Sequence, residues 1–348
     1  ESSVLDSLNH LQYFTEASWK ECSPETAGQF SAIAYYFGKM LQDSLKVPVG
    51  LICNAIGGSP AEAWIDRRTL EYEFPAILRN WTKNDFIQDW VRGRAALNVK
   101  KSSHKFQRHP YEPCYLFESG ILPLQQYPIK GVLWYQGESN AHNKDAHEKL
   151  FKLLVQSWRK NWNNEQMPFY FVQIAPYRAS NPDKKRGGFM MWAQAQTVAM
   201  IPHSGMASAH DVGEYHVIHP ARKKPIGDRL AYLALQNDYG FKYLDANTPV
   251  PTSVEFKEGE AIVKFNVGEM GLNPRSQDLK GFEMAGEDGA FYPAVATLHG
   301  RGAKAIKVYK CPQVTNPVAV RYAWKRWSPP TMFNGSGVPM TPFYLTKE

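Results

Sequence analysis

The chain has 348 residues, of which 43% are hydrophobic, and this length is enough for one large domain and a smaller one. Its longest apolar runs, residues 47–58 and 168–177, fall short of the roughly 20 residues that span a bilayer, so we expect a soluble protein with no membrane partner. The net charge of +7 arises from scattered basic residues and not from a basic patch, which argues against a nucleic acid partner.

The expected elements, in chain order, alternate between helix and strand. A helix is predicted from Ser23, a capping residue with Pro24 at the first helical position, through a helical repeat of apolar residues that ends at Leu41. A buried strand is predicted next, over residues 49–56. Continuous apolar strands that alternate with helices favour a parallel sheet covered on both faces. The later strands are expected at residues 129–136, 168–175 and 205–210, and the later helices at residues 145–162, 189–200 and 220–238.

Two regions depart from this alternation. Residues 67–123 are aromatic and polar without clear periodicity, which is typical of a long insertion near a functional site. From residue 246 onward, short strand-like runs separated by Gly, Pro and Asn turns predict an antiparallel β region. We therefore predict an α/β domain over residues 1–245 and a β domain over residues 246–348.

The four cysteines, Cys22, Cys53, Cys114 and Cys311, show neither Cys-x-x-Cys spacing nor a cluster with histidine, and no His-Glu-x-x-His sequence occurs. We therefore expect no metal and no cofactor. Disulfides and buried thiols both remain open for these cysteines.

Three informative segments, residues 54–64, 134–143 and 210–220, follow predicted strands. Ligands bind at the carboxyl ends of the strands in an open parallel sheet, so these segments predict a site. In the second segment, the sequence GESNA around Ser139 resembles a nucleophile elbow, and Ser139, Asp211 and His219 follow the chain order of α/β-hydrolases. However, alanine stands where that motif ends in glycine, and a serine beside asparagine is a common turn residue.

In the alternative interpretation, this turn serves a nucleophile located elsewhere. Gln136, Ser139 and Asn140 offer side-chain donors, and Gly57 and Gly58 let backbone N–H groups approach a ligand closely. Because both turns follow strands of one predicted sheet, together they can form an oxyanion hole, in which each donor contributes about 3 kcal/mol.

His219 is the best candidate for a general base. It precedes Pro220 at a predicted helix start, and imidazoles are the commonest general bases in enzymes. A purely structural histidine is the competing interpretation. Asp211 and Glu214 are candidates for the carboxylate that orients its ring.

Six blocks of sequence occur in unbroken order between about residue 18 and the C-terminus. They are FSAIAYYFGKMLQDSLKVPVGLICNAIGGSPAEAW (30–64), HPYEP (109–113), IKGVLWYQGESNA (129–141), IHPARKKPIGDRLA (218–231), VRYAWKRW (320–327) and GVPMTPF (337–343). With these blocks the chain resembles the sialate O-acetylesterase family of SGNH-type carbohydrate esterases. The resemblance implies a flavodoxin-like three-layer domain, a β-sandwich-like accessory domain, and hydrolysis of acetyl esters on sugars by serine, histidine and usually aspartate.

Carried over by position, the resemblance implies that His219 is the general base and Gly58 the backbone oxyanion donor. It assigns the side-chain donor to Gln136 or Asn140. The substrate it implies is sialic acid or another acetylated glycan, and the setting it implies is secreted, periplasmic or lysosomal.

Some positions differ from the family pattern. The family commonly places an aspartate three residues before the histidine, where this chain has His216, so Asp211 or a backbone carbonyl is left to orient His219. Glu118 and Leu122 stand where the family tends to carry Asn and His, which implies different substrate contacts there.

The family's nucleophilic serine belongs to a GQSN motif at the end of its first strand, and the 348 residues contain no GQSN. One explanation is that the first strand and its serine are missing from this chain, for example because a separate N-terminal chain carries them. The others are a short form that binds glycans without hydrolysing them, and an esterase that uses Ser139 instead. A sheet without its first strand leaves an edge exposed, which favours the first explanation.

Overall fold

The structure, a computed structural model, describes residues 2–177, 188–274 and 278–347. The chain divides into two compact units. Unit 1 comprises residues 1–30, 52–169 and 201–203, and unit 2 comprises residues 31–51, 170–200 and 204–348. The domain boundary predicted at residue 245, which follows the change in sequence pattern, stays a prediction.

The longest helix of unit 1, α7 (Lys144–Asn161), confirms the helix predicted over residues 145–162. Asn143 caps it by accepting a hydrogen bond from the backbone N–H of Ala146. Its predicted apolar face is buried and consists of Leu150, Leu153, Leu154 and Trp158. The other helices of unit 1 are α1 (Ser2–Asn9), α2 (Pro24–Ala27), α4 (Arg67–Glu73), α5 (Pro75–Leu78) and α6 (Asp89–Val99), with 3₁₀ turns at Ala61–Trp64, Trp81–Lys83, Leu122–Leu124 and Glu138–Asn140 and a π-helical turn at Phe117–Ile121.

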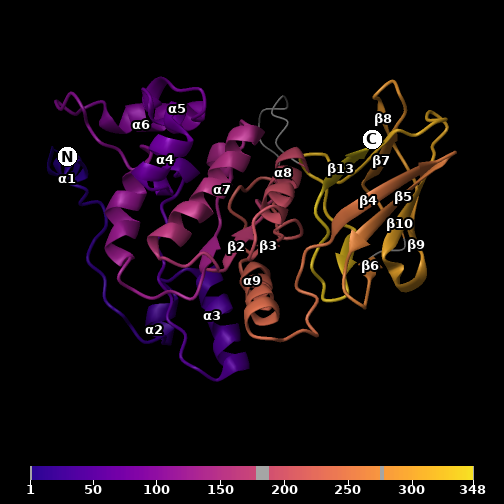
Figure 1. Ribbon diagram of the computed structural model, residues 1–348, viewed down its shortest axis with the longest axis horizontal. Coiled ribbons are helices and arrows are strands. Elements are labelled where there is room, and N and C mark those ends of the chain that lie inside the picture. Colours follow the sequence, from indigo (N-terminus) through magenta and orange to yellow (C-terminus); the bar gives the residue numbers. More distant parts are fainter. Residues whose placement is uncertain (1, 178–187, 275–277, 348) are drawn as a thin grey trace. The chain divides into compact units, whose positions relative to one another are not determined.

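Residues 67–123 contain regular helices where the sequence showed no periodicity, and α4, α5 and α6 lie together in unit 1 (Figure 1). In α6 only Val91 and Ala95, one turn apart, are buried. Such a narrow apolar stripe is too weak to be recognised as a helical pattern. These helices are therefore held by contacts with the rest of unit 1 and not by a strong amphipathic face of their own.

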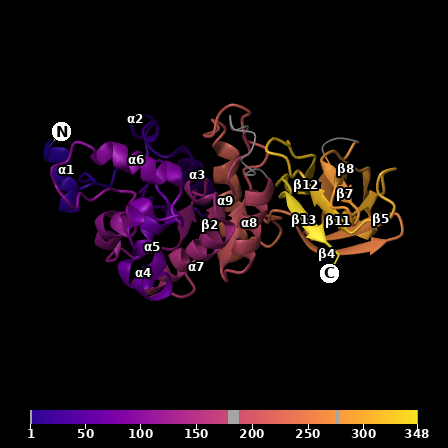
Figure 2. The ribbon, with the colours of Figure 1, turned by 90° about the horizontal axis from the view of Figure 1, so that it is seen from above.

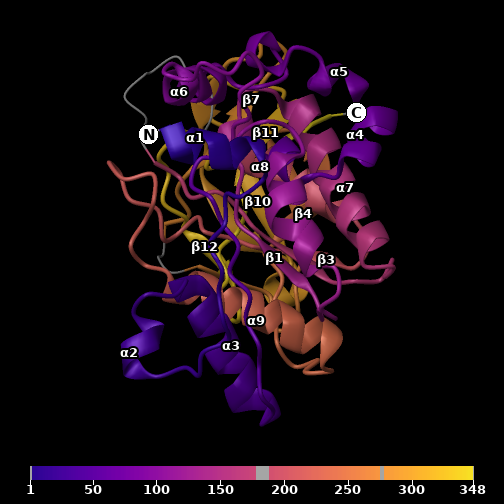
Figure 3. The same cartoon turned by 90° about the vertical axis from the view of Figure 1, so that its left-hand side faces the viewer.

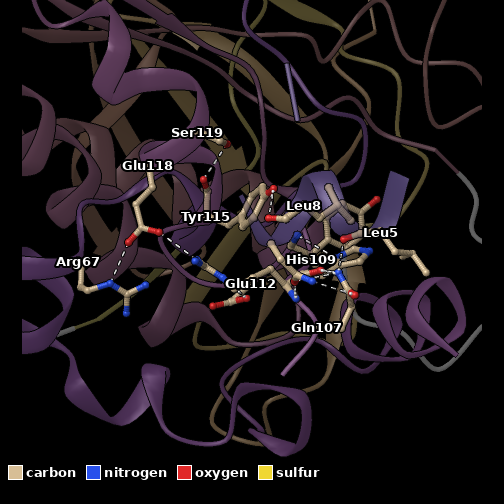
Figure 4. A network of polar contacts seen from close by, with 12 residues as sticks. Leu5, Leu8, Arg67, Gln107, His109, Glu112, Tyr115, Glu118 and Ser119 are labelled. Atoms are coloured by element: carbon tan, nitrogen blue, oxygen red, sulfur yellow. Dashed lines mark hydrogen bonds and ion pairs between the residues drawn. The ribbon is translucent and has the colours of Figure 1, made fainter. Parts of the chain in front are cut away.

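A network of polar contacts fixes the end of this segment against α1 (Figure 4). The Gln107 side-chain amide donates a hydrogen bond to the backbone carbonyl of Leu5 at 2.8 Å. The Tyr115 hydroxyl donates to the carbonyl of Leu8 at 2.9 Å. Because these carbonyls lie in α1 itself, the network satisfies backbone acceptors of a short helix.

The single helix predicted from Ser23 to Leu41 is wrong, because two helices occupy this stretch. Ser23 does cap α2, with Pro24 in its first turn, but α2 ends at Ala27. The second helix, α3 (Ala32–Leu45), has its own cap, Ser31, whose hydroxyl accepts a hydrogen bond from the backbone N–H of Ala34. A second capping serine thus starts a new helix inside one apolar repeat.

The strand predicted over residues 49–56 is also wrong. This stretch belongs to no β-ladder among the described residues, and the Ile52 side chain is exposed. A strand needs a neighbour that pairs its backbone N–H and C=O groups, and an apolar sequence alone does not supply one.

The other three predicted strands are confirmed, although each is shorter than predicted. Strands β1 (Val132–Trp134), β2 (Phe169–Val172) and β3 (Ser204–Ala207) form a parallel sheet in the order β1-β2-β3. All four residues of β2 are buried, as expected for a central strand of a covered parallel sheet. The predicted α/β class is therefore confirmed.

In unit 2, α8 (Gly188–Ala199) and α9 (Lys224–Asp238) pack against β3, and both confirm predicted helices. Helix α3 packs along α9 (Figure 3). The helices approach closely at Gly227, where an added Cβ would lie 2.8 Å from the backbone oxygen of Ile33. No described helix has the length and apolar character that crossing a bilayer requires.

The antiparallel β region predicted after residue 246 is confirmed and lies in unit 2 (Figure 2). Its two larger sheets have the strand orders β4-β5-β10-β9 and β13-β11-β7-β8, and β12 pairs with β6. A shared core holds them together, in which Phe282, Tyr322 and Phe343 are in mutual ring contact. The strands are β4 (Val250–Lys257), β5 (Glu260–Asn266), β6 (Leu272–Pro274), β7 (Phe282–Ala285), β8 (Phe291–Pro293), β9 (Ala296–His299), β10 (Ala305–Tyr309), β11 (Ala319–Tyr322), β12 (Met332–Asn334) and β13 (Phe343–Thr346), with a 3₁₀ turn at Arg301–Ala303.

Candidate active site

The Gly57–Gly58 turn of unit 1 can be made only by glycine at its second position. Gly58 has a φ of +74°, in the left-handed region that other residues rarely adopt. A Cβ added to Gly58 would lie 2.5 Å from Cη2 of Trp90 and 2.8 Å from Oη of Tyr111. Two aromatic side chains therefore pack against this turn, and the predicted close approach of a ligand to its backbone N–H groups stays a prediction.

The Tyr111 hydroxyl sets the direction of this turn by donating a hydrogen bond to the carbonyl oxygen of Gly57 at 2.8 Å. The peptide bond that follows this carbonyl is trans, so the N–H of Gly58 points away from Tyr111. One tyrosine thus fixes the orientation of a backbone donor.

A second turn, Glu138–Asn140, begins four residues after β1 ends and is joined to the first. The Ser139 hydroxyl donates a hydrogen bond to the carbonyl oxygen of Gly58 at 2.8 Å, and Ser139 is only 6% exposed. The structure therefore brings Gly58, Gln136 and Asn140 together within unit 1, and Ser139 holds the two turns to each other.

The Asn140 side chain is held by three groups. Its oxygen accepts hydrogen bonds from the backbone N–H of Ala61 at 2.9 Å and from the Gln136 amide at 2.6 Å. Its nitrogen donates to a carboxylate oxygen of Glu62 at 2.8 Å. Two donors contact one end of the amide and a carboxylate contacts the other, so the first end must be the oxygen and the second the nitrogen. Gln136 therefore orients Asn140.

Glu62 is a functional candidate that the sequence analysis missed. Its side chain is 0% exposed, and burial raises the pKa of its carboxyl to about 7. Within the described residues, the carboxylate oxygen that does not contact Asn140 has no hydrogen-bond partner. The signal was a single glutamate in the run AEAWI, which alone does not distinguish a buried carboxyl from a surface one.

His219 lies in unit 2, exposed, in the loop that leads into α9. Glu214 fixes this loop, because its carboxylate accepts a hydrogen bond from the backbone N–H of Ala221 at 2.6 Å. The loop thus presents the His219 imidazole to solvent from a defined backbone.

Asp211 makes a two-pronged ion pair with Arg229 of α9. The Arg229 guanidinium nitrogens lie 2.6 and 2.8 Å from the two carboxylate oxygens, and the side chains are only 6% and 11% exposed. No hydrogen bond joins Asp211 to His219 in the described part of unit 2. The sequence analysis missed Arg229 as the partner of this carboxylate.

Comparison with known proteins supplies the context for these turns. The profile of a family described as "Carbohydrate esterase, sialic acid-specific acetylesterase" matches residues 11–236. The chain belongs to this family of carbohydrate esterases. It is 28% identical to the sialate O-acetylesterase of Mus musculus over 93% of this chain, and 26% identical to that of Homo sapiens over 94%. The chain spans 65% and 64% of these relatives' length.

A solved structure supports the same assignment. The crystal structure of a carbohydrate acetylesterase from Xanthomonas citri matches with a TM-score of 0.79 and 30% identity, over 96% of this chain and 69% of that chain. The resemblance expected from the six sequence blocks is confirmed, and so is the fold class that it implied.

One departure from the family pattern has a structural counterpart. Glu118, which stands where the esterase family tends to carry Asn, accepts hydrogen bonds from Arg67 at 2.8 Å and from Arg108 at 2.9 Å (Figure 4). Arg108 also binds Glu112 at 3.0 Å, which extends the network. In this chain the position therefore carries a structural ion-pair network. Leu122 is exposed.

The cysteines of the chain form no disulfide. Cys22 and Cys53 are exposed, Cys114 is buried and Cys311 is half-buried, and all four are free thiols. Within the described ranges, no group of three or more His, Cys, Asp and Glu side chains is arranged to hold a metal ion.

Proposed function

We propose that the whole protein removes O-acetyl groups from a carbohydrate by a serine–histidine mechanism. The observation that carries the proposal is the pair of joined turns around Gly58 and Asn140, found in a chain of this esterase family. No step of this mechanism uses a metal or an organic cofactor.

The joined turns suit the stabilisation of an oxyanion. The N–H of Gly58 is held in one direction, and the Asn140 amide has a second N–H besides the one that Glu62 accepts. Donors fixed before the reaction stabilise the negative charge that develops on the ester oxygen, by about 3 kcal/mol each. The role predicted for Gln136 or Asn140 is therefore assigned to Asn140, with Gln136 as the residue that positions it.

His219 acts as the general base in this proposal. The nucleophilic serine attacks the acetyl carbonyl carbon while His219 accepts the hydroxyl proton. The bond between the carbonyl carbon and the sugar oxygen then breaks, and His219 returns the proton to that oxygen. Water attacks the acetyl-serine by the same route and releases acetate.

Asp211 is proposed as the acid partner of His219. Each carboxylate oxygen that Arg229 binds keeps a further lone pair, so Asp211 can accept a hydrogen bond from an imidazole N–H without giving up Arg229.

We propose that the serine comes from a GQSN segment outside these 348 residues, on the same chain or on a separate one. The support is that no GQSN occurs in the sequence and that two parts of the fold can accept another strand. Strand β1 lies at the edge of its sheet, and residues 49–56 have a strand sequence but belong to no described ladder.

The test uses the full-length protein and measures acetate release from acetylated sugars and hydrolysis of nitrophenyl acetate. We expect His219→Ala to lower both rates by at least about 100-fold, since a general base contributes this much or more. Ser139→Ala tests the alternative nucleophile: the lost bond between the turns should lower activity only in part, whereas complete loss identifies Ser139 as the nucleophile. Retained activity in His219→Ala contradicts the mechanism, whereas sugar binding without acetate release by the unsubstituted protein identifies a glycan-binding module.

A further inference from the structure

We propose that Trp90 and Arg94 of α6 form the sugar-binding wall beside the Gly57–Gly58 turn and select acetylated sugars that carry a carboxylate. This inference rests on the proposed function, because it assumes that the ester is placed at the Gly58 N–H. It adds a specificity determinant from a helix that the mechanism does not use.

Trp90 is an exposed tryptophan packed directly on the turn. It is 52% exposed, although its ring edge lies so close to Gly58 that a Cβ there would be 2.5 Å from it. Its ring lies 6.1 Å from the Tyr111 ring at an angle of 30°, and Tyr111 is itself bonded to Gly57. The indole is therefore held on one side by fixed groups and open to solvent on the other.

About half of the Trp90 side chain is left open to a ligand, although the residue packs on a turn of the candidate site. The open face of an indole offers a flat, electron-rich surface to C–H groups of a ligand. A pyranose ring that stacks on Trp90 is placed next to the Gly58 donor, where an acetyl ester on the ring can reach it.

Arg94 lies one helical turn after Trp90, on the same face of α6. It is exposed, and its charge acts on Tyr111, where it opposes the rise in the hydroxyl pKa that burial causes. Arg94 therefore lies near the aromatic pair that borders the turn.

The Arg94 guanidinium is available to a ligand. Within the described residues, no carboxylate forms an ion pair with Arg94. The two acidic residues nearest to it in the sequence, Asp89 and Asp85, bind Arg92 instead. An arginine fork binds a carboxylate through two parallel hydrogen bonds. Residues one turn apart have Cβ atoms about 5–6 Å apart, which matches a sugar ring on Trp90 with its carboxylate on Arg94.

The test begins with binding and so does not depend on hydrolysis. Isothermal titration of the full-length protein compares N-acetylneuraminic acid, which carries a carboxylate, with neutral methyl glucoside. We expect the unsubstituted protein to bind N-acetylneuraminic acid more tightly than methyl glucoside. Arg94→Gln should lower the affinity for N-acetylneuraminic acid by about 10- to 100-fold, the loss expected for one charge-assisted hydrogen-bonded pair, and leave the affinity for methyl glucoside unchanged. Trp90→Ala should weaken binding of both sugars.

Matched controls come from the same segment. Arg79→Gln removes an equal charge from an exposed position, and Tyr72→Ala removes an exposed aromatic ring. Both should bind as the unsubstituted protein does. Circular dichroism spectra and unfolding midpoints check that Trp90→Ala and Arg94→Gln are folded.

A kinetic comparison separates this inference from the proposed function. We expect Arg94→Gln to lower kcat/KM for an O-acetylated acidic sugar by the same factor and to leave nitrophenyl acetate unchanged within about twofold, since that ester has no carboxylate. Hydrolysis of nitrophenyl acetate without any preference for acidic sugars overturns the inference and leaves the function standing. Arg94-dependent binding without hydrolysis overturns the function and leaves the inference standing.

Discussion

The buried carboxyl of Glu62 makes the stability of the protein depend on pH in a predictable direction. Glu62→Gln keeps the shape of the side chain and an oxygen that accepts the hydrogen bond from Asn140, but it removes the ionisable group. The perturbation therefore changes the charge at this position and little else.

The magnitude follows from the pKa. Burial raises the pKa of Glu62 from 4.5 to about 7, so the folded state binds a proton that the unfolded state releases. The stability that this proton contributes is fully present below about pH 4.5 and is lost as the pH rises through about 7. The shift corresponds to about 3 kcal/mol of unfolding free energy, because each pKa unit is worth about 1.4 kcal/mol.

Urea unfolding of both proteins is measured at several pH values between 5 and 9. The quantity of interest is the free energy of unfolding of Glu62→Gln minus that of the unsubstituted protein. We expect this difference to rise by about 3 kcal/mol across the range, so that Glu62→Gln is relatively more stable at alkaline pH. All other titrating groups cancel in the difference. The control is Glu165→Gln, at an exposed position, for which the difference should stay constant. A difference for Glu62→Gln that is equally constant refutes the reasoning.

Three further predictions concern the joined turns and the Asp211 ion pair. Gly58→Ala should abolish acetate release and lower the thermal unfolding midpoint, because the φ of +74° and the close neighbours of Gly58 leave no room for a Cβ. Gly57→Ala should change neither, because nothing lies within 4 Å of the added Cβ. Ser139→Ala should cost about 1 kcal/mol in urea unfolding through the lost bond to the Gly58 carbonyl, and it should retain most activity; complete inactivity would return Ser139 to the role of nucleophile. Asp211→Asn should cost about 3–5 kcal/mol because it leaves the buried Arg229 charge unpaired, and a loss below about 1 kcal/mol in denaturant unfolding would contradict a buried pair.

Local sequence patterns predicted the elements that carry a strong pattern of their own. Helix α7 combines a capping Asn143 with a continuous apolar face, and β2 is a short run of large apolar residues. Residues 49–56 have an equally apolar sequence, but strand formation depends on a pairing partner, which no pattern within the segment reveals. Helix α6 was missed for the opposite reason, because its weak pattern is completed by contacts outside the helix, among them those with Trp81–Lys83 and with Tyr111.

The two turns were predicted to lie together, although only the second of them follows a strand of the structure, β1, while the partners of the buried charged residues depend on long-range pairing. The turns around Gly58 and Asn140 were expected to cooperate because both follow predicted strands, and a hydrogen bond through Ser139 joins them. Glu62 and Arg229 were missed because a charged residue is normally at the surface, and only the folded chain shows which ones are buried and what they bind. Trp90 lay in a segment without periodicity, where an exposed aromatic residue cannot be told from a core one.

The hydrogen bond from Tyr111 to Gly57 has a kinetic consequence. A peptide group between two glycines flips easily, because no Cβ hinders the rotation, and the donor would face the site in only a fraction of molecules at any instant. In the proposed mechanism, the Tyr111 hydrogen bond holds this peptide group in the productive orientation before an ester arrives. Without this hydrogen bond, fewer molecules would be ready to react when substrate is mixed in. A pre-steady-state burst of product would then shrink in amplitude.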